Sequence, residues 1–266
     1  MRKNNLESIL NDKTSGSTEL VLVINKFFKD NIDNLRLIRQ SIEKIEAKMK
    51  NFEVAINYLK SFRKILVSGK KEQLERFVNN FELENMNSYL RIFENLKPLI
   101  RNKKRVFTMS NSQTVYEILK LWFNENRKVE IVIAESRPVF EGRILAKKLL
   151  KLGVKVLLIP DCNSAACISK CDVVIIGADK ILSNGDVVNK TGSKNAAIIS
   201  KYYDKPFVVI ASQKKFSKQS TFSSKLQNSS EIWKFRHKYL KIENHYFEVV
   251  PKKLITKIIS DGDSYK

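Results

Sequence analysis

Residues 154–179 read VKVLLIPDCNSAACISKCDVVIIGAD, and this stretch decides the fold class. It contains two short apolar runs, 154–159 and 173–176, separated by a segment of helix length. Apolar runs of this length, rich in β-branched residues, are typical of strands buried on both faces of a parallel sheet. We therefore expect a parallel sheet with helices on both sides.

The same alternation continues on either side of this stretch. Further apolar runs occupy 106–109, 129–134 and 207–210, and amphipathic segments of helix length cover 114–126, 143–152 and 194–203. Five of the eight glycines fall between Gly142 and Gly192, at the ends of these runs, where open parallel sheets hold their ligands. Residues 217–230 are rich in Ser and Lys and predict a surface loop, and 247–259 predict a last strand and a short helix.

The first hundred residues predict helices. Apolar residues recur at spacings of three and four from Leu35 to Leu66, which indicates one long amphipathic helix ending before Gly69. Its apolar stripe suits packing on neighbouring helices, with a coiled coil as the alternative. Two shorter helices are expected at 71–81 and 84–97. The predicted class is α/β, with a helical domain over 1–104 and a Rossmann-like parallel-sheet domain over 105–266.

Composition excludes several classes of protein. Of 266 residues, 43% are hydrophobic and 29% charged, which excludes a largely disordered or fibrous chain. No apolar run approaches the roughly 20 residues that cross a bilayer, no secretory leader is apparent, and the three cysteines are too few for a disulfide scaffold. We expect a cytoplasmic protein without a membrane partner. The net charge of +21 leaves nucleic acid open as a partner, although a general excess of lysine explains it more simply.

Three polar clusters follow the predicted strands. Residues 108–112, Thr-Met-Ser-Asn-Ser, stand between a strand and a helix, where backbone amides and hydroxyls form a phosphate cradle or simply cap the helix. Asp179 follows the most apolar strand, at the position where acid–base groups lie in such sheets, or it caps the next turn. Residues 189–193 and Arg137 supply further groups for an anion. Neither cysteine nor histidine spacing suits a metal, no dinucleotide motif is present, and we expect no cofactor.

Taken together, the motifs resemble a known superfamily. The decisive segments are 134–143 (AESRPVFEGR), 177–192 (GADKILSNGDVVNKTG) and Lys215-Phe216. They are similar to the regulatory subunits (alpha, beta, delta) of translation initiation factor 2B and to the aldose-phosphate isomerases for ribose 1,5-bisphosphate and methylthioribose 1-phosphate. The resemblance covers nearly the whole chain, with 15–17 and 251–256 also at comparable positions.

This resemblance implies specific roles. In the isomerases a cysteine and an aspartate move hydrogen between C1 and C2 of the sugar; Asp179 matches the aspartate, and Ser110 stands at the cysteine position. The residues that the resemblance assigns to ligand binding are Ser15, Gly16, Ser112, Arg137, Asn189, Lys190 and Lys215. Because a serine hydroxyl, unlike a thiol, needs an adjacent base, binding without turnover is favoured.

The resulting prediction is a factor 2B-like regulatory subunit that binds a phosphorylated sugar or nucleotide. The alternative is an active sugar-phosphate isomerase, and a general RNA or polyanion binder is less favoured. The resemblance also implies a homodimer or a hetero-oligomer with related subunits.

Overall fold

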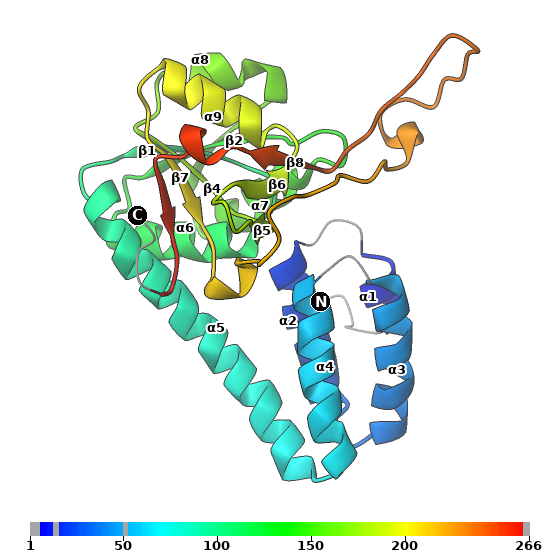
Figure 1. Ribbon diagram of the computed structural model, residues 1–266. Helices are drawn as coiled ribbons and strands as arrows, with labels where there is room; N and C mark the ends of the chain where they lie inside the picture. The colour runs from blue at the N-terminus through cyan, green and yellow to red at the C-terminus, as the bar shows by residue number, and fades with distance from the viewer. Residues whose placement is uncertain (1–5, 13–15, 50–52, 263–266) are drawn as a thin grey trace. The chain divides into compact units, whose positions relative to one another are not determined.

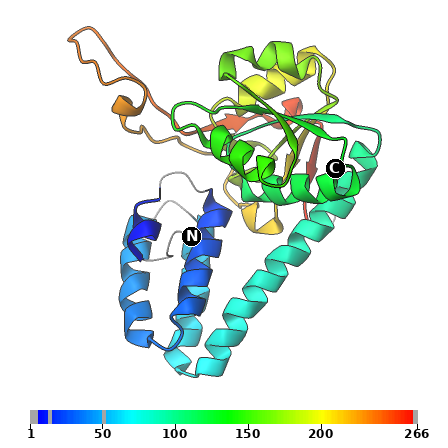
Figure 2. The ribbon, with the colours of Figure 1, turned by 180° about the vertical axis from the view of Figure 1, so that it is seen from behind.

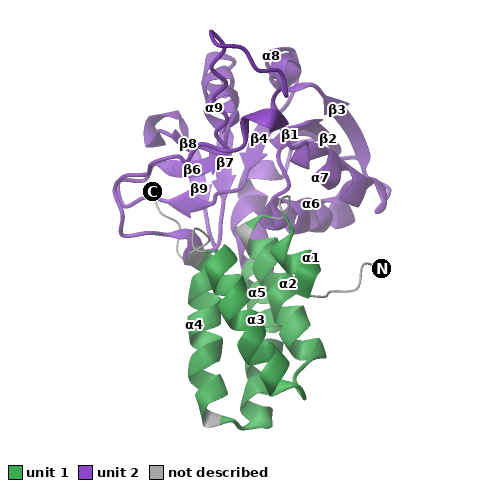
Figure 3. Ribbon diagram, turned by 90° about the vertical axis from the view of Figure 1, so that its right-hand side faces the viewer, with its two compact units in different colours: residues 1–88 green, residues 89–266 purple. Residues whose placement is uncertain are grey.

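The computed structural model describes residues 6–12, 16–49 and 53–262 (Figure 1). Its contacts divide the chain into two compact units, Met1–Ser88 and Tyr89–Lys266 (Figure 3). The division falls inside one helix, α5, whereas the sequence predicts a domain boundary between residues 104 and 105. We describe each unit by itself.

Unit 1 consists of helices packed around aromatic side chains. The helices are α1 (Leu6–Leu10), α2 (Ser17–Asp30), α3 (Leu35–Lys48), α4 (Glu53–Ser68) and the first part of α5 (Lys71–Ile100). The rings of Phe28 and Phe62 lie 4.5 Å apart at the centre of the core, and Tyr58 and Phe77 pack beside them. Ring clusters of this kind bury a large apolar area per residue and so stabilise a small bundle.

Two predictions for the helices are wrong. The stripe from Leu35 to Leu66 belongs to two helices, α3 and α4, because both bury their apolar faces in one core and the periodicity continues across the break. No Gly or Pro stands between them to signal it. Conversely, 71–81 and 84–97 form the single helix α5, in which Leu83 is 59% exposed and interrupts the apolar stripe but not the helix.

Unit 2 is built on a six-stranded parallel sheet in the order β3-β2-β1-β4-β7-β9. The strands are β1 (Arg105–Met109), β2 (Glu130–Ala134), β3 (Lys155–Ile159), β4 (Val173–Ile176), β7 (Phe207–Ile210) and β9 (Lys257–Ile259). The first five match the apolar runs of the sequence within one residue. Strand β9 was not predicted; it lies beside β7, with Ile258 opposite Val209.

Helices cover both faces of this sheet and form separate cores. One face packs on α6 (Gln113–Glu125), α7 (Glu141–Leu150) and the end of α5, and the other packs on α8 (Ser164–Ile168) and α9 (Ser193–Tyr202). Neighbouring residues of one strand serve opposite cores: Val106 belongs to the first and Phe107 to the second. This double burial explains why the strands are continuous apolar runs.

A small antiparallel sheet, β5-β6-β8, completes unit 2. Its strands are β5 (Lys180–Ile181), β6 (Val187–Lys190) and β8 (Phe247–Val250). The turn between β5 and β6 contains Gly185 at a φ of +85°, a conformation that favours glycine. The short 3₁₀ helices are η1 (Asp161–Asn163), η2 (Gln213–Lys215), η3 (Ser229–Glu231) and η4 (Lys252–Leu254). Strand β6 of this small sheet positions Asn189 and Lys190 at the edge of the six-stranded sheet.

Candidate functional site

The strand order places a topological switch point at the carboxyl ends of β1 and β4. The chain leaves β1 toward β2 on one side, and β4 lies on the other side of β1. Ligands of open α/β sheets bind at such a switch point. Ser110 and Ser112 follow β1, and Gly177 and Asp179 follow β4, so four residues of the predicted clusters lie in the loops at this switch point.

The loop after β1 is tied to the loop after β2. The backbone N–H of Ser110 donates to Oγ of Ser136 at 2.7 Å, and both residues have a φ of +63°. The carboxylate of Asp161, beyond β3, accepts from the backbone N–H groups of Ser136 (2.8 Å) and Arg137 (2.7 Å). Ser136 and Asp161 were not singled out as site residues, because serine and aspartate at strand ends are too common to signal such a role.

Ser112 has two structural roles. Its side chain accepts from the backbone N–H of Val115 at 3.4 Å and so caps α6. It also lies against the loop after β4: a Cβ added at Gly177 would stand 2.5 Å from the Ser112 hydroxyl oxygen. Glycine at position 177 therefore allows the two loops to approach each other closely.

Asp179 and Lys215 are electrostatic neighbours. Lys215, in η2 after β7, is buried, and this burial lowers the pKa of its ammonium group, while the negative charge of Asp179 acts in the opposite direction. The backbone N–H of Asp179 donates to the carbonyl of Val188 at 2.9 Å, which fixes the aspartate beside the small sheet. A buried cation beside a carboxylate is an arrangement that both binding and proton transfer use.

Lys190 is held by an acid and two rings. Its Nζ lies 2.6 Å from Oε1 of Glu141, the first residue of α7, and 4.6 and 4.7 Å from the ring centroids of Tyr246 and Phe247. Beside it, Nδ2 of Asn189 donates to Oγ of Ser193 at 2.8 Å. The sequence motif contained Glu141, but nothing in it indicated the partner.

The N-terminus of α9 is occupied by the protein itself. Oε1 of Glu248 accepts from the backbone N–H groups of Gly192 (2.7 Å) and Lys194 (2.9 Å). We expected an anion-binding role for the segment before this helix. The carboxylate of Glu248 occupies the backbone N–H groups that an anionic ligand would use. A ligand would therefore contact the side chains of this segment instead.

The remaining predicted residues are Arg137, Gly16 and Ser15. Arg137 is exposed, and its guanidinium donates to the carbonyl of Ile232 at 3.4 Å. Gly16 precedes α2 in unit 1 and is its N-cap residue. Ser15 lies outside the described residues.

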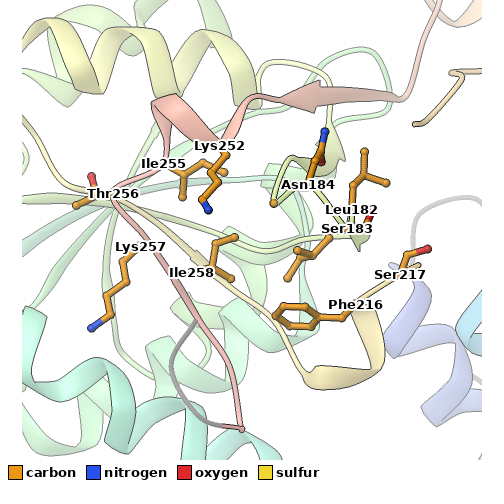
Figure 4. Close-up of a pocket in the computed structure, with 12 residues that line it drawn as sticks. Leu182, Ser183, Asn184, Phe216, Ser217, Lys252, Ile255, Thr256, Lys257 and Ile258 are labelled. Carbon is orange, nitrogen blue, oxygen red and sulfur yellow. The ribbon is translucent and has the colours of Figure 1, made fainter. Parts of the chain in front are cut away.

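Two cavities of unit 2 bear on the site. Arg137, Glu141 and Lys190 line a hollow of about 10 Å³ together with Tyr246 and neighbouring residues. A larger cavity of about 560 Å³ lies beside β5 and β9, and Figure 4 shows Lys252, Lys257 and Phe216 among its lining. Ser112 and Asp179 line neither of these two cavities. The predicted site residues thus lie in pairs along one edge of the large sheet. They do not together line either of these two cavities.

The described residues contain neither a cluster of metal ligands nor a membrane-spanning helix. Across residues 6–12, 16–49 and 53–262, no three His, Cys, Asp or Glu side chains gather as a metal site requires. No helix within the same ranges is both long and apolar enough to cross a bilayer.

Comparison with known proteins identifies the family. The model of the initiation factor 2 subunit family matches residues 5–262. The chain belongs to this family. It is 30% identical, over 210 residues, to the ribose 1,5-bisphosphate isomerase of Methanocaldococcus jannaschii, an alignment that covers 74% of this chain and 68% of that protein.

Solved structures share the fold of this chain. The 5-methylthioribose 1-phosphate isomerase of Pyrococcus horikoshii gives a TM-score of 0.84 at 18% identity, covering 96% of this chain and 82% of that one. A chain of the tetrameric eIF2B-beta2-delta2 complex of C. thermophilum gives a TM-score of 0.74 at 15% identity, covering 97% and 89%. The predicted class, a helical region followed by a parallel-sheet α/β region, is confirmed.

Proposed function

We propose that this chain binds a phosphorylated sugar or nucleotide at the carboxyl edge of the unit 2 sheet, as a regulatory subunit of the factor 2B type, without converting the ligand. One observation carries the second half of this proposal: within the described residues, the hydroxyl of Ser110 makes no hydrogen bond to a base. A serine hydroxyl becomes a proton-transfer group or nucleophile only when a neighbouring base activates it.

The binding half of the proposal rests on the cationic groups at this edge. Arg137 and Lys190 line the same small hollow, and Lys215 adds a buried cation after β7; lysine and arginine are the usual phosphate ligands of proteins. The amide of Asn189 and the hydroxyl of Ser112 add neutral groups suited to sugar hydroxyls. None of these roles requires a reactive thiol.

The buried cysteine nearest to β4 offers no substitute thiol. Cys171 is buried, and desolvation raises its pKa to about 12. At neutral pH it stays protonated, whereas the thiolate is the reactive form.

An active isomerase is the second candidate function. Asp179 beside the buried ammonium of Lys215 supports it, because a carboxylate and a lysine with a lowered pKa can exchange protons with a sugar. The 30% identity with the ribose 1,5-bisphosphate isomerase of M. jannaschii supports the same chemistry.

We also propose assembly with another copy or with related subunits. The edge strand β3 exposes Leu157 and Leu158, and α9 exposes Ile198 and Tyr202. Exposed large apolar side chains are found at protein interfaces. Sedimentation analysis of Ile198→Asp tests this: the variant should be smaller than the wild-type assembly, and an unchanged size contradicts the role of α9.

Ligand-dependent stabilisation tests the binding proposal. Ribose 1,5-bisphosphate, methylthioribose 1-phosphate and AMP are added to the purified chain, and the melting temperature is followed; a ligand at 100 times its Kd adds about 2.7 kcal/mol to the stability of the folded state. Lys190→Ala should abolish the shift. The matched control, Lys252→Ala, changes a lysine of the cavity in Figure 4 and should retain it. The reverse pattern would place the ligand in that cavity and contradict the proposal.

A further inference from the structure

An arm of unit 2 carries a row of exposed aromatic and basic side chains. Figures 1 and 2 both show the segment before β8, coloured orange, extending away from the sheet and its helices. Residues 232–241 at its end read IWKFRHKYLK, and every one of them is exposed. We call these ten residues the arm tip. Tyr239 is 83% exposed and Trp233 56%, values that a folded chain rarely shows for such large rings.

The rings of the arm tip follow one another in a ladder. Ring centroids are separated by 4.7 Å between Trp233 and Phe235, 6.4 Å between Phe235 and His237, and 5.5 Å between His237 and Tyr239. The first two pairs are stacked, with interplanar angles of 26° and 5°. Alternate side chains of an extended segment point to the same side, which explains the stacking of Trp233, Phe235 and His237. The chain turns after His237, where the backbone N–H of Leu240 donates to the carbonyl of His237 at 3.0 Å.

The base of the arm is held firmly by hydrogen bonds. Oε2 of Glu231 accepts from the hydroxyl of Tyr246 (2.5 Å) and from Nδ2 of Asn244 (2.9 Å). The backbone N–H of Gln227 donates to the carbonyl of Asn244 at 2.8 Å. Asn244 itself is buried. The arm tip is therefore presented on an ordered stem.

The charge of the arm tip indicates its partner. Lys234, Arg236, Lys238 and Lys241 alternate with the rings, and the ten residues contain no acid. Of these four cations, only Lys241 has a carboxylate partner among the described residues, Glu243. The arm tip of a second copy carries the same four cations and would be repelled by this segment. A polyanion with flat apolar groups would be attracted by both features.

We propose that the arm tip binds single-stranded nucleic acid, with bases stacking on the rings and phosphates contacting the basic side chains between them. Proteins that bind single strands without sequence preference combine these two elements. Paired bases are stacked within a duplex and are not free to stack on the rings, so the arm tip should discriminate against double strands. The sugar-phosphate site is not needed for this binding.

Tryptophan fluorescence reports directly on the arm tip. The chain has two tryptophans, and Trp122 is buried at 3% exposure in the core of unit 2, so Trp233 is the exposed emitter. Titration with a ten-nucleotide oligouridylate should quench its emission, and a duplex RNA of equal length should quench it far less. If four phosphates are contacted, affinity should fall about 50-fold between 50 and 200 mM salt, from a slope of about 0.7 per contact.

Paired variants separate the arm tip from general charge. Phe235→Ala with Tyr239→Ala should weaken binding about tenfold or more, and so should Lys234→Ser with Arg236→Ser. The control Lys44→Ser with Lys60→Ser removes the same charge from exposed positions of unit 1 and should leave affinity within about twofold. All variants should melt at the wild-type temperature, because the changed side chains are exposed.

Three outcomes overturn the proposal. Equal losses in the arm and unit 1 variants mean binding by overall charge alone. Absence of quenching at 50 mM salt means that the arm tip does not bind the strand. A change in sedimentation on Trp233→Ala, without RNA binding by the wild type, means that the rings serve contacts between copies of the chain.

Discussion

Nζ of Lys190 lies 2.6 Å from Oε1 of Glu141, and their side chains are only 18% and 4% exposed. The lysine expected to bind phosphate is thus neutralised by an internal acid in the ligand-free chain. Glu141→Gln keeps the shape of the side chain and removes its charge. We expect the affinity for sugar phosphates to rise several-fold by isothermal titration calorimetry, because the phosphate no longer competes with a carboxylate.

The same substitution should lower stability. Breaking a buried ion pair by removing one partner leaves the other charge uncompensated, and for this partly exposed lysine we expect a loss of about 1–3 kcal/mol by urea unfolding. The double variant Glu141→Gln with Lys190→Met is the control and should recover most of that loss while binding no ligand. An unchanged affinity in Glu141→Gln contradicts a phosphate contact at Lys190.

Close approach of the loops after β1 and β4 makes Gly177 sensitive to substitution. In Gly177→Ala the new methyl group would stand 2.5 Å from the hydroxyl oxygen and 2.9 Å from Cβ of Ser112. We expect a loss of about 1–3 kcal/mol in the free energy of unfolding. Ser112→Gly alone removes a helix cap and should cost only a few tenths of a kcal/mol. Combined with Gly177→Ala, it should restore most of the stability; additive losses would show that the two loops are not in contact.

Burial of Lys215 predicts a dependence of stability on pH. Its pKa is lowered in the folded chain by desolvation, against the opposing charge of Asp179. Between this lowered pKa and the ordinary value of about 10.4, the unfolded chain holds a proton that the folded chain lacks. The contribution of Lys215 to stability therefore increases as pH rises through this interval and is lost as pH falls.

Lys215→Met isolates that contribution. The free energy of unfolding of the wild type minus that of the variant should increase with pH up to about 10.4, as measured by urea unfolding. The subtraction removes the titration of the other lysines and tyrosines. A difference that stays constant or decreases with pH would mean that the ammonium of Lys215 is not destabilised by burial.

Much of the α/β unit is predictable from sequence because its strands are short apolar runs bounded by glycine and polar residues. Strand β9 was missed because Lys257-Ile258-Ile259 is too short for a pattern and pairs only through a contact 49 residues away, Val209 with Ile258. The break between α3 and α4 was missed because a shared core preserves the apolar spacing.

The candidate site is only partly predictable. Asp179 and Lys190 belong to the sequence motif and could be predicted as site residues. The residues that contact them could not be predicted. Glu141 contacts Lys190, and Asp161 contacts the Ser136 loop, through the tertiary fold across segments far apart in sequence. Similarly, nothing local indicates that Glu248 occupies the amides at the start of α9.

Turnover is the central question, and one NMR experiment addresses it. The wild type, Ser110→Cys and Asp179→Asn are each incubated with ribose 1,5-bisphosphate and with methylthioribose 1-phosphate, and the anomeric proton of the aldose is followed over time. We predict no conversion by the wild type, and measurable conversion by Ser110→Cys, because a thiol with a pKa near 8.5 supplies the group that the serine lacks. Conversion by the wild type that Asp179→Asn abolishes would contradict binding without turnover and establish the isomerase instead.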